Sequence, residues 1–358
     1  MTKYHIAVIP GDGIGNEVVP EGLRVLERAG SQFGIDFTFQ HFDWSCEVYK
    51  KTGRMMPEDG IARLRDHDAI FFGAAGFPGV PDHISLWGLL IPIRRELDQY
   101  VNLRPVRLLP GVVAPIRALP GEIDFWVVRE NSEGEYSQIG GRIFAGTPEE
   151  TVIQEAIFTR RGTDRILRYA FEFARRIGKK HVTSATKSNG IFHSMPFWDE
   201  RFAIISAEYP DVAADQYHID ILAAHFVMSP QRFGVVVGSN LFGDILSDLG
   251  PGVTGTIGVA PSGNINPERK YPSMFEPVHG SAPDIAGKGV ANPIGQIWSA
   301  AMMLDHLGHA EAAAHIVKAF ENVLITDRNL LTPDLGGKGT TRGMANAILA
   351  AMDAGQDQ

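Results

Sequence analysis

The sequence predicts an α/β fold with an open sheet whose strands are joined by helical crossovers. Short apolar runs at residues 6–9 and 69–72 have the length and composition of buried strands. A segment at residues 18–29 follows the first of these runs and carries apolar residues at helical spacing. Strands that alternate with helices in this way favour a sheet with crossover connections.

The first third of the chain continues this alternation. A glycine-rich loop at residues 11–15 separates the first strand from the first helix. Residues 37–42 alternate like a strand, and residues 61–66 have a helical pattern. Residues 78–92 are rich in proline and glycine, and we expect a loop there that leads into a helix.

The later part of the chain repeats the two patterns. An apolar run at 125–128 ends in charged residues, and strands are predicted at 180–186 and 235–237. Helices are predicted at 165–177, 300–307, 310–322 and 343–354. Domain boundaries near 100–108 and 250–258 would divide the 358 residues into a discontinuous domain and an inserted one, in line with about two domains for this length.

A protruding hairpin is predicted in the middle of the chain. Residues 136–145 and 151–159 alternate like strands, and the turn between them contains Gly146, Thr147 and Pro148. A two-stranded hairpin alone is only marginally stable. We therefore expect this hairpin to pair with something else, such as a second subunit.

Composition excludes several classes of protein. The net charge of −9 disfavours nucleic acid as a partner, because a nucleic-acid backbone requires clustered positive charge. No apolar stretch approaches the ~18 residues of a membrane span, and the N-terminus lacks the apolar core of a secretory signal. The single cysteine, Cys46, is expected to be a buried apolar residue. We expect a cytoplasmic protein without a membrane partner.

The glycine loop is not an ordinary dinucleotide-binding fingerprint. That fingerprint requires G-x-G-x-x-G, and here Gly11 and Gly13 are followed by Asn16 at the third glycine position. Asp12 would also place a negative charge where a pyrophosphate binds. We therefore expect a tight turn after the strand and a fold that is not a Rossmann fold.

Several charged residues could form a site for an acidic substrate and a metal. Arginine forks match carboxylates, although spacing alone also fits surface ion pairs for Arg94, Arg104 and Arg129. Asp244 and Asp248 are four residues apart on a predicted helix and share one face, where their charges repel each other. A bound cation would relieve this repulsion. Alternatively, the two carboxylates form an acidic helix face exposed to solvent. Asp220 is a third acid, and because its sequence neighbours are apolar it could complete the metal site.

Two further residues could transfer protons. Lys187 follows the strand at 180–186, and near a metal and arginines its pKa could fall far enough for it to act as a base. Tyr136 could act as an acid in the right site. Taken alone, each residue fits a structural role better, as a surface lysine and a packing tyrosine.

A dense loop at 275–293 has the composition of a nucleotide site. It contains glycines, prolines, His279, Asp284 and Asn292 within nineteen residues. His279 and Asn292 are placed to contact adenine and ribose, whereas Asp284 would accept from ribose hydroxyls and repel a 2′-phosphate. This charge favours NAD over NADP.

Together these stretches resemble the β-decarboxylating dehydrogenase family, which includes isocitrate and isopropylmalate dehydrogenases. The ordered set of motifs runs from I-P-G-D-G-I-G at residue 9 to D-L-G-G-K-G-T-T at 334: N-L-R-P, R-E-N-S-E-G-E-Y, T-K-S-N-G, G-D-I-L-S-D and E-P-V-H-G-S-A-P-D-I-A-G-K-G. The resemblance implies the isopropylmalate/isocitrate dehydrogenase-like fold, with two α/β domains around a cleft. The larger domain would comprise 1–104 and 254–358, and the inserted one 105–253, with a hairpin at about 136–160 that clasps a second subunit.

The resemblance also implies residue roles. Arg94, Arg104 and Arg129 look like the clamp for substrate carboxylates, with Lys187 as the base and Tyr136 as the general acid. Asp244 and Asp248 look like Mn²⁺ or Mg²⁺ ligands from one subunit of a homodimer, with Asp220 and Lys187 contributed by the other. The NAD site would be formed by His279, Gly280, Ser281, Ala282, Asp284, Ile285 and Asn292. K⁺ is allowed as an activator, without identified ligands.

The loop before Arg94 is expected to decide the substrate. Ser85-Leu86-Trp87-Gly88 resembles the D-malate and tartrate branch of the family, and Trp87 would fill the space that a larger substituent needs. Because a pocket discriminates by only about 1–3 kcal/mol per methylene, some activity on larger 2-hydroxy acids is expected. The alternatives are an isopropylmalate or homoisocitrate type of enzyme and a non-catalytic nucleotide-binding subunit. The sequence does not rank D-malate against the tartrates, or a dimer against a tetramer.

Overall fold

A computed structural model describes residues 2–355, and the chain divides into two compact units. Unit one joins the residues up to Gln99, Arg104–Ile123 and the residues from Pro251 onward, and unit two joins Tyr100–Leu103 and Asp124–Gly250. Residues 105–123, which we expected in the inserted domain, thus group with unit one. Arg107 there forms an ion pair with Glu321 of the same unit at 2.7 Å.

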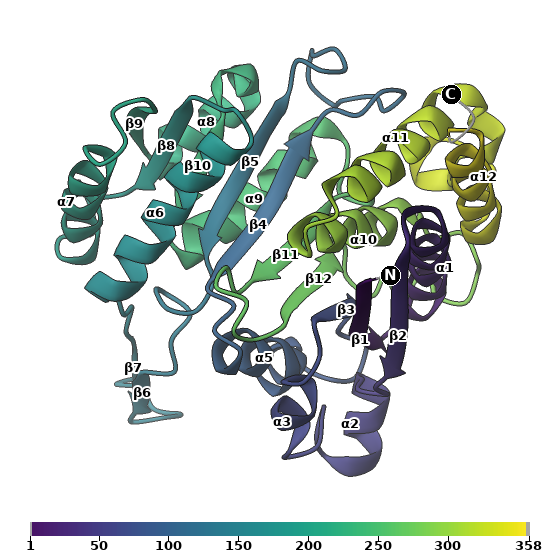
Figure 1. Cartoon of the computed structure of the whole chain (residues 1–358). Coiled ribbons are helices and arrows are strands. Elements are labelled where there is room, and N and C mark those ends of the chain that lie inside the picture. The colour runs from purple at the N-terminus through teal and green to yellow at the C-terminus, as the bar shows by residue number, and fades with distance from the viewer. Residues whose placement is uncertain (1, 356–358) are drawn as a thin grey trace. The chain divides into compact units, whose positions relative to one another are not determined.

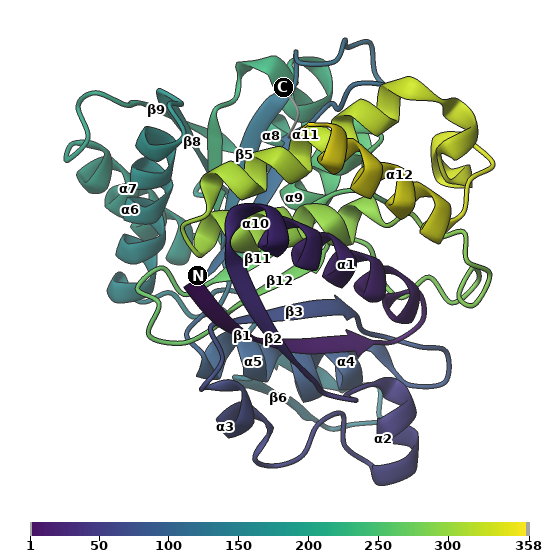
Figure 2. The same cartoon turned by 45° about the vertical axis from the view of Figure 1, so that its right-hand side comes forward.

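The sheet of unit one has the predicted α/β character. Its strands lie in the order β2-β1-β3-β12-β11-β4. The neighbours β2, β1, β3 and β12 run parallel, whereas β11 is antiparallel to β12 (Figure 2). The bounds are β1 Thr2–Gly11, β2 Ile35–His41, β3 Ala69–Ala74, β4 Val101–Arg107, β11 Pro261–Ile265 and β12 Ser273–Pro277.

Helices cover both faces of this sheet. Ile9, Phe72 and Met274 belong to a core cluster with residues of the segments between residues 42 and 97, whereas Phe71 on the other face approaches Gly22 of α1. Alternate strand residues point to opposite faces, so each strand feeds both cores. The helical bounds are α1 Gly15–Phe33, α2 Cys46–Thr52, α3 Gly60–Leu64, α4 Asp82–Ser85, η1 Leu86–Leu90, α5 Ile91–Glu96, α10 Ile294–His306, α11 Ala310–Thr326, η3 Arg328–Leu330, η4 Pro333–Leu335 and α12 Thr341–Ala354.

Unit two has a smaller sheet that is mostly parallel. Its strands lie in the order β4-β5-β10-β8-β9, and β5, β10, β8 and β9 are parallel neighbours (Figure 1). Its core contains Phe125, Val236, Phe171, Trp198 and Phe226. The bounds are β5 Asp124–Glu130, α6 Arg160–Arg176, β8 His181–Thr186, α7 Ser194–Ser206, β9 Ala213–His218, α8 Ile219–Met228, η2 Pro230–Arg232, β10 Val235–Gly238 and α9 Asn240–Thr254.

The predicted hairpin exists but is shorter than expected. Its strands are β6 (Gly140–Ile143) and β7 (Thr151–Gln154), and every residue in them is exposed. Figure 1 shows it extending away from the sheet of unit two. Thr159, which we assigned to a strand, accepts a hydrogen bond from the N–H of Gly162 and caps α6. The prediction was wrong there because a Thr followed by helix-compatible residues is also an N-cap signal.

The other sequence-based expectations have clear outcomes. The structure confirms the following predicted elements, some of them longer or shifted: the strands at 6–9, 69–72, 180–186 and 235–237 and the helices at 18–29, 165–177, 310–322 and 343–354. Cys46 is fully buried, as expected. Among the helices of residues 2–355, none is both long enough and apolar enough to cross a membrane.

Candidate functional site

The expected catalytic residues of unit two gather at one edge of its sheet. Four parallel strands end at Glu130, Thr186, His218 and Gly238, so the segments that follow them meet at the same edge. Lys187 directly follows the end of β8, Asp220 lies two residues after the end of β9, and α9 begins shortly after the end of β10. Ligands of open α/β sheets bind beyond the carboxyl ends of the strands.

Arg129, Tyr136 and Asp244 form a single cluster. The buried Arg129 forms an ion pair through Nη1 with Asp244 and donates to Oδ1 of Asn240 from Nε and Nη2, at 3.0 and 2.7 Å. The Tyr136 hydroxyl donates to the second oxygen of Asp244 at 2.5 Å. The guanidinium also lies over the Tyr136 ring, 5.3 Å from its centroid. The structure thus brings Asp244 to Arg129 and Tyr136, the first and last residues of the motif R-E-N-S-E-G-E-Y.

Lys187 and Asp220 form a second pair at this edge. Lys187 Nζ lies 3.0 Å from Asp220 Oδ1. The hydrogen bond from Lys187 is the main reason that the pKa of Asp220 lies below its usual value. The Asp220 side chain is 68% exposed, although apolar residues flank it in the sequence. An exposed carboxylate beside a lysine has oxygen lone pairs free for a further ligand.

The predicted metal ligands do not meet within one chain. Asp244 and Asp248 lie one turn apart on α9, where both side chains share a face. Within residues 2–355, no group of three Asp, Glu, His or Cys side chains is arranged to hold a metal ion. The donors themselves are carboxylate oxygens, which are the ligands that Mg²⁺ and Mn²⁺ prefer.

Unit one holds the other two arginines of the expected clamp. Arg94 on α5 is buried, and its Nη2 donates to Oε1 of Glu276 at 3.1 Å, while its buried Nε has no protein partner. Arg104 on β4 donates from Nε to the hydroxyl of Ser262 at 3.3 Å. Burying a guanidinium is costly unless it is paired. The Glu276 carboxylate meets that requirement for Arg94, and sequence reasoning had not identified Glu276.

The residues expected to select the substrate lie just before Arg94. Ser85 is buried at the end of α4, and its hydroxyl donates to the carbonyl of Asp82 at 3.0 Å. Trp87 is half-buried within η1, a π-helical segment. Arg95 lies over its ring, 5.0 Å from the centroid. This segment is continuous helix, not the loop that its glycine and proline content suggested.

The glycine turn and the predicted nucleotide loop are in contact within unit one. The N–H of Ile14 donates to the carbonyl of Ser281 at 2.9 Å, and a Cβ on Gly13 would lie 2.0 Å from that same oxygen. Gly13 also has a positive φ of 54°, so this close approach requires glycine. Glu17, which sequence reasoning missed, accepts from the N–H groups of Gly287 and Gly289.

Asp12 has a structural role in this turn. It is buried, and its carboxylate accepts from the N–H of Cys46 at 2.9 Å and of Gly76 at 3.0 Å. Two loops are thereby tied to the carboxyl end of β1. Asp12 thus serves to hold these loops, which explains why an acid stands where a pyrophosphate could not bind. This structural role agrees with the expectation that the fold is not a Rossmann fold.

The expected NAD residues lie along the 279–292 loop. Burial lowers the pKa of the His279 ring, whose Nδ1 lies 3.0 Å from the carbonyl of Gly280, and its buried Nε2 has no protein partner. Asn292 is buried; its amide donates to Asp334 at 3.0 Å and its oxygen accepts from the N–H of Ile294. Asp284 is exposed, whereas Ala282 and Ile285 pack against Ile14 and Val18.

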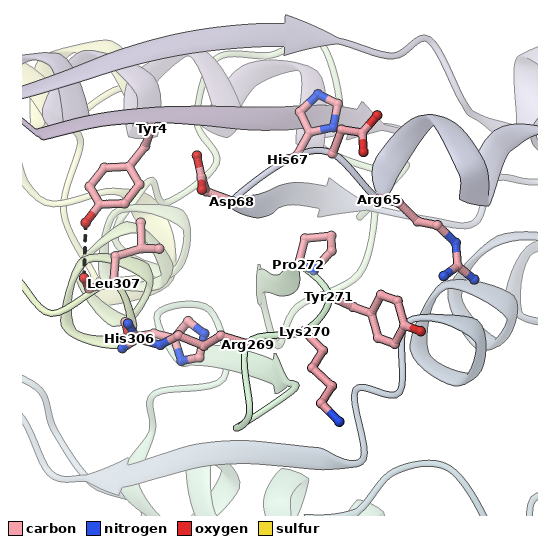
Figure 3. Close-up of a pocket in the computed structure, with 11 residues that line it drawn as sticks. Tyr4, Arg65, His67, Asp68, Arg269, Lys270, Tyr271, Pro272, His306 and Leu307 are labelled. Carbon is pink, nitrogen blue, oxygen red and sulfur yellow. Dashed lines mark hydrogen bonds between the residues drawn. The ribbon is translucent and has the colours of Figure 1, made fainter.

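A separate pocket of about 360 Å³ lies at the opposite edge of unit one's sheet. Figure 3 shows it at the amino ends of β1, β3 and β12, with the Tyr4 hydroxyl donating to the carbonyl of Leu307 at 3.2 Å. None of the predicted site residues lines it. Its charged lining mixes both signs: Arg65, Arg269, Lys270, Asp66 and Asp68. We therefore assign it no part in the candidate site.

Known proteins resemble the chain over nearly its whole length. The profile of the isocitrate/isopropylmalate dehydrogenase family matches residues 5–348. The chain is 59% identical to D-malate dehydrogenase (decarboxylating) of Escherichia coli, covering 97% of this chain and 98% of that protein. It is 58% identical to tartrate dehydrogenase/decarboxylase of Pseudomonas putida, covering 98% and 99%.

A solved structure supports the same assignment. The isocitrate dehydrogenase of Methylococcus capsulatus superposes with a TM-score of 0.87 at 36% identity, covering 98% of this chain and 99% of that one. The resemblance therefore extends to sequence, fold and full length. The chain belongs to the isocitrate/isopropylmalate dehydrogenase family, and it is an oxidoreductase of hydroxy acids in a family that generally uses NAD(P) and a divalent metal.

Proposed function

We propose that this protein oxidises four-carbon 2-hydroxy diacids with NAD, converting D-malate to pyruvate and CO₂. L-Tartrate would yield oxaloglycolate and NADH. Meso-tartrate would yield glycerate and CO₂ without net NADH, because the hydride would return to the keto intermediate after CO₂ leaves. The observation that carries this proposal is the 58–59% identity, over almost the entire chain, to proteins named for D-malate and tartrate. The clustering of Arg129, Tyr136 and Asp244 supports it, because a dehydrogenase needs anion-binding and proton-transferring groups together.

The arginines are proposed to bind the substrate. Arg94, Arg104 and Arg129 are each buried, and each is held by at least one neutral or acidic partner: Glu276, Ser262 and Asn240. Arginine pairs with carboxylates bidentately, and a guanidinium whose rotamer is already restrained loses less entropy on binding. A diacid provides the two carboxylates that such a set can take.

A divalent ion fits the acidic donor set. Asp244 and Asp248 of one chain and Asp220 of a second would hold Mn²⁺ or Mg²⁺, since all three offer carboxylate oxygens. When bound, the ion would polarise the hydroxyl and carboxylate of the substrate. Arg129 and Tyr136 contact Asp244 from the protein side and orient its carboxylate.

Two side chains are proposed to move protons. Lys187, as the neutral amine, would accept the proton of the C2 hydroxyl, and Asp220 at 3.0 Å would stabilise the ammonium group that results. NAD, when bound, would supply the acceptor for the hydride. After CO₂ leaves the 2-keto diacid, Tyr136 donates a proton to the carbon that carried it. The Tyr136 hydroxyl is already oriented by its hydrogen bond to Asp244.

NAD is proposed as the preferred cofactor. Asp284 is exposed on the loop that contacts the glycine turn, so a 2′-phosphate there would meet a negative charge. His279 keeps a buried, unpartnered Nε2, and its lowered pKa favours the neutral ring that accepts or donates one hydrogen bond to a base or ribose. The preference for NAD over NADP is tested by comparing the rate of NADH formation with the rate of NADPH formation.

A homodimer with shared sites is proposed as the working assembly. Large apolar side chains are exposed on the hairpin, including Ile143 and Val152, and beside the expected metal ligands, namely Ile221 and Ile245. Exposed apolar patches mark surfaces that are covered by partners. A second copy placed over α8 and α9 would cover these side chains and bring Asp220 and Lys187 to Asp244 and Asp248.

Steady-state kinetics test the reaction. NADH formation and CO₂ release are measured with Mn²⁺ for D-malate, L-tartrate, meso-tartrate, 3-isopropylmalate and isocitrate, with K⁺ exchanged for choline in a parallel series. We expect D-malate or a tartrate to have the highest kcat/KM and a chelator to abolish turnover. A preference for isopropylmalate or isocitrate would contradict the proposal.

Subunit complementation tests the shared site. Lys187→Ala and Asp244→Asn are each expected to reduce kcat by orders of magnitude as homodimers, with Lys180→Ala as a surface control. Mixed and refolded, the two variants form heterodimers in which one site of two is intact, so about a quarter of wild-type activity returns with random pairing. No recovery from a mixture of inactive variants would mean that Lys187 and Asp244 act in the same chain.

A further inference from the structure

The helix that carries the expected substrate residues contains one π-turn. The N–H of Ile91 donates to the carbonyl of Leu86, five residues earlier, and Ser85 and Leu90 on either side keep helical dihedral angles. The chain therefore runs as one helix from Asp82 to Glu96 with one extra residue inserted. Single π-turns within α-helices occur frequently at functional sites.

The π-turn decides which arginine lies next to Trp87. At 100° per residue, residues seven apart in an uninterrupted α-helix nearly share a face, so Trp87 would align with Arg94. One inserted residue shifts this relation by one position. Arg95 then falls over Trp87, and Arg94 turns away from it.

The contacts agree with this register. Arg95 lies 5.0 Å from the centroid of the Trp87 ring, whereas Arg94 is buried against Glu276 at 3.1 Å. Trp87 is only half-buried, and it is not part of the core cluster that contains Leu89 and Ile93. The core beneath the helix therefore does not fix the indole, and the stacked guanidinium restrains it.

We propose that Arg95 is a positioning residue for substrate size, which acts by holding Trp87 against the site. This inference rests on the proposed function and on the expectation from the sequence that Trp87 fills the space that a larger substituent of the substrate needs. A planar guanidinium stacks on an aromatic face more effectively than an ammonium does. Release of the indole would open the space that a branched diacid requires.

Selectivity kinetics provide the main test. We expect Arg95→Ala to raise the ratio of kcat/KM for 3-isopropylmalate to that for D-malate about tenfold, the effect of roughly one methylene in an apolar pocket. Arg95→Lys should give a smaller change. Arg176→Ala, which removes an arginine 5.1 Å from the centroid of the Phe173 ring in unit two, is the matched control and should leave the ratio unchanged.

A double-mutant cycle separates positioning from direct binding. If Arg95 acts only through the indole, Arg95→Ala should produce no further change in a Trp87→Ala background. A full additional effect in that background would show that Arg95 contacts the substrate itself and would overturn the inference. An unchanged ratio in Arg95→Ala alone would overturn it as well.

Fluorescence keeps the test independent of the reaction. The difference between wild-type and Trp87→Phe protein isolates the emission of Trp87, and its quenching by acrylamide should increase about twofold or more in Arg95→Ala. If wild-type protein fails to oxidise any four-carbon diacid, the proposed function fails, and the quenching measurement still decides whether Arg95 restrains Trp87. Equal quenching with and without Arg95 would contradict the inference whatever the substrate.

Discussion

The buried pair of Arg94 and Glu276 allows a quantitative prediction. The two side chains are 8% and 9% exposed, and Oε1 of Glu276 accepts both from Arg94 at 3.1 Å and from the amide of Asn264 at 2.6 Å. Substitution Glu276→Ala removes both acceptor contacts. It leaves the buried guanidinium without its opposite charge.

The expected magnitude follows from burial. Removing one partner of a buried ion pair costs about 3–5 kcal/mol, because the remaining charge stays desolvated. Glu276→Gln retains one carbonyl oxygen as acceptor and loses only the charge assistance, so we expect about 1–2 kcal/mol. The free energy of unfolding of a typical domain is about 5–15 kcal/mol, so both variants should remain measurable.

Equilibrium unfolding in urea measures the stability change, and initial rates measure the functional one. Because Arg94 is proposed to bind a substrate carboxylate, loss of its orienting partner should raise KM for D-malate about tenfold, with a smaller change in KM for NAD. The matched control is Glu321→Ala. Glu321 pairs with Arg107 at 2.7 Å, but both side chains are partly exposed, so about 1 kcal/mol or less is expected.

One comparison decides the outcome. If Glu276→Ala destabilises the protein no more than Glu321→Ala does, burial of the pair is not what makes it strong. If stability falls but KM for D-malate is unchanged, Glu276 has only a structural role and Arg94 does not depend on it for substrate binding.

Three further outcomes are expected. Asp12→Ala leaves one buried and one partly buried N–H group without this acceptor and should lower the free energy of unfolding by about 2–4 kcal/mol in urea titrations; a change below 1 kcal/mol would contradict this. Burial raises the pKa of the Cys46 thiol to about 11, so thiol reagents at pH 8 should label it only after denaturation, and rapid labelling of folded protein would refute its burial. The pKa of His279 in the folded protein lies below its unfolded value of about 6.5. The stability that the neutral ring contributes is therefore present above pH 6.5 and is lost as the pH falls from there through the folded pKa. The His279→Gln variant should lose less stability than the wild type between pH 7.5 and 5.5, as the urea midpoints of the apoprotein would show.

Local sequence patterns predicted the helices and strands whose apolar residues recur at regular spacing, and missed those without such spacing. The strand at 6–9 and the helix at 310–322 are apolar at the spacing that their structure requires. In contrast, β11 (Pro261–Ile265) is wholly buried although it contains Pro, Ser, Gly and Asn. None of the residues of β9 (Ala213–His218) is fully buried, as suits the edge of the sheet. Such strands depend on neighbours that are distant in the sequence, so their own residues carry little signal.

Partner residues were harder to predict than the site residues themselves. Arg94 was recognisable from its motif, but Glu276 lies 182 positions away and becomes its partner only because α5 and β12 belong to the same unit. Likewise Glu17 could not be linked to Gly287 before the glycine turn and the nucleotide loop were seen in contact. Sequence separation does not report spatial distance once strands are reordered in a sheet.

The sequence by itself determined the α/β class, the family and the chemical types at the site, because strand periodicity is local and the ordered motifs are specific. The tertiary structure decided which charges are neutralised, which arginine faces Trp87 and which loop closes on the glycine turn. These features depend on burial and on the helical register. One inserted residue in a π-turn, or one carboxylate excluded from water, changes them without changing any motif.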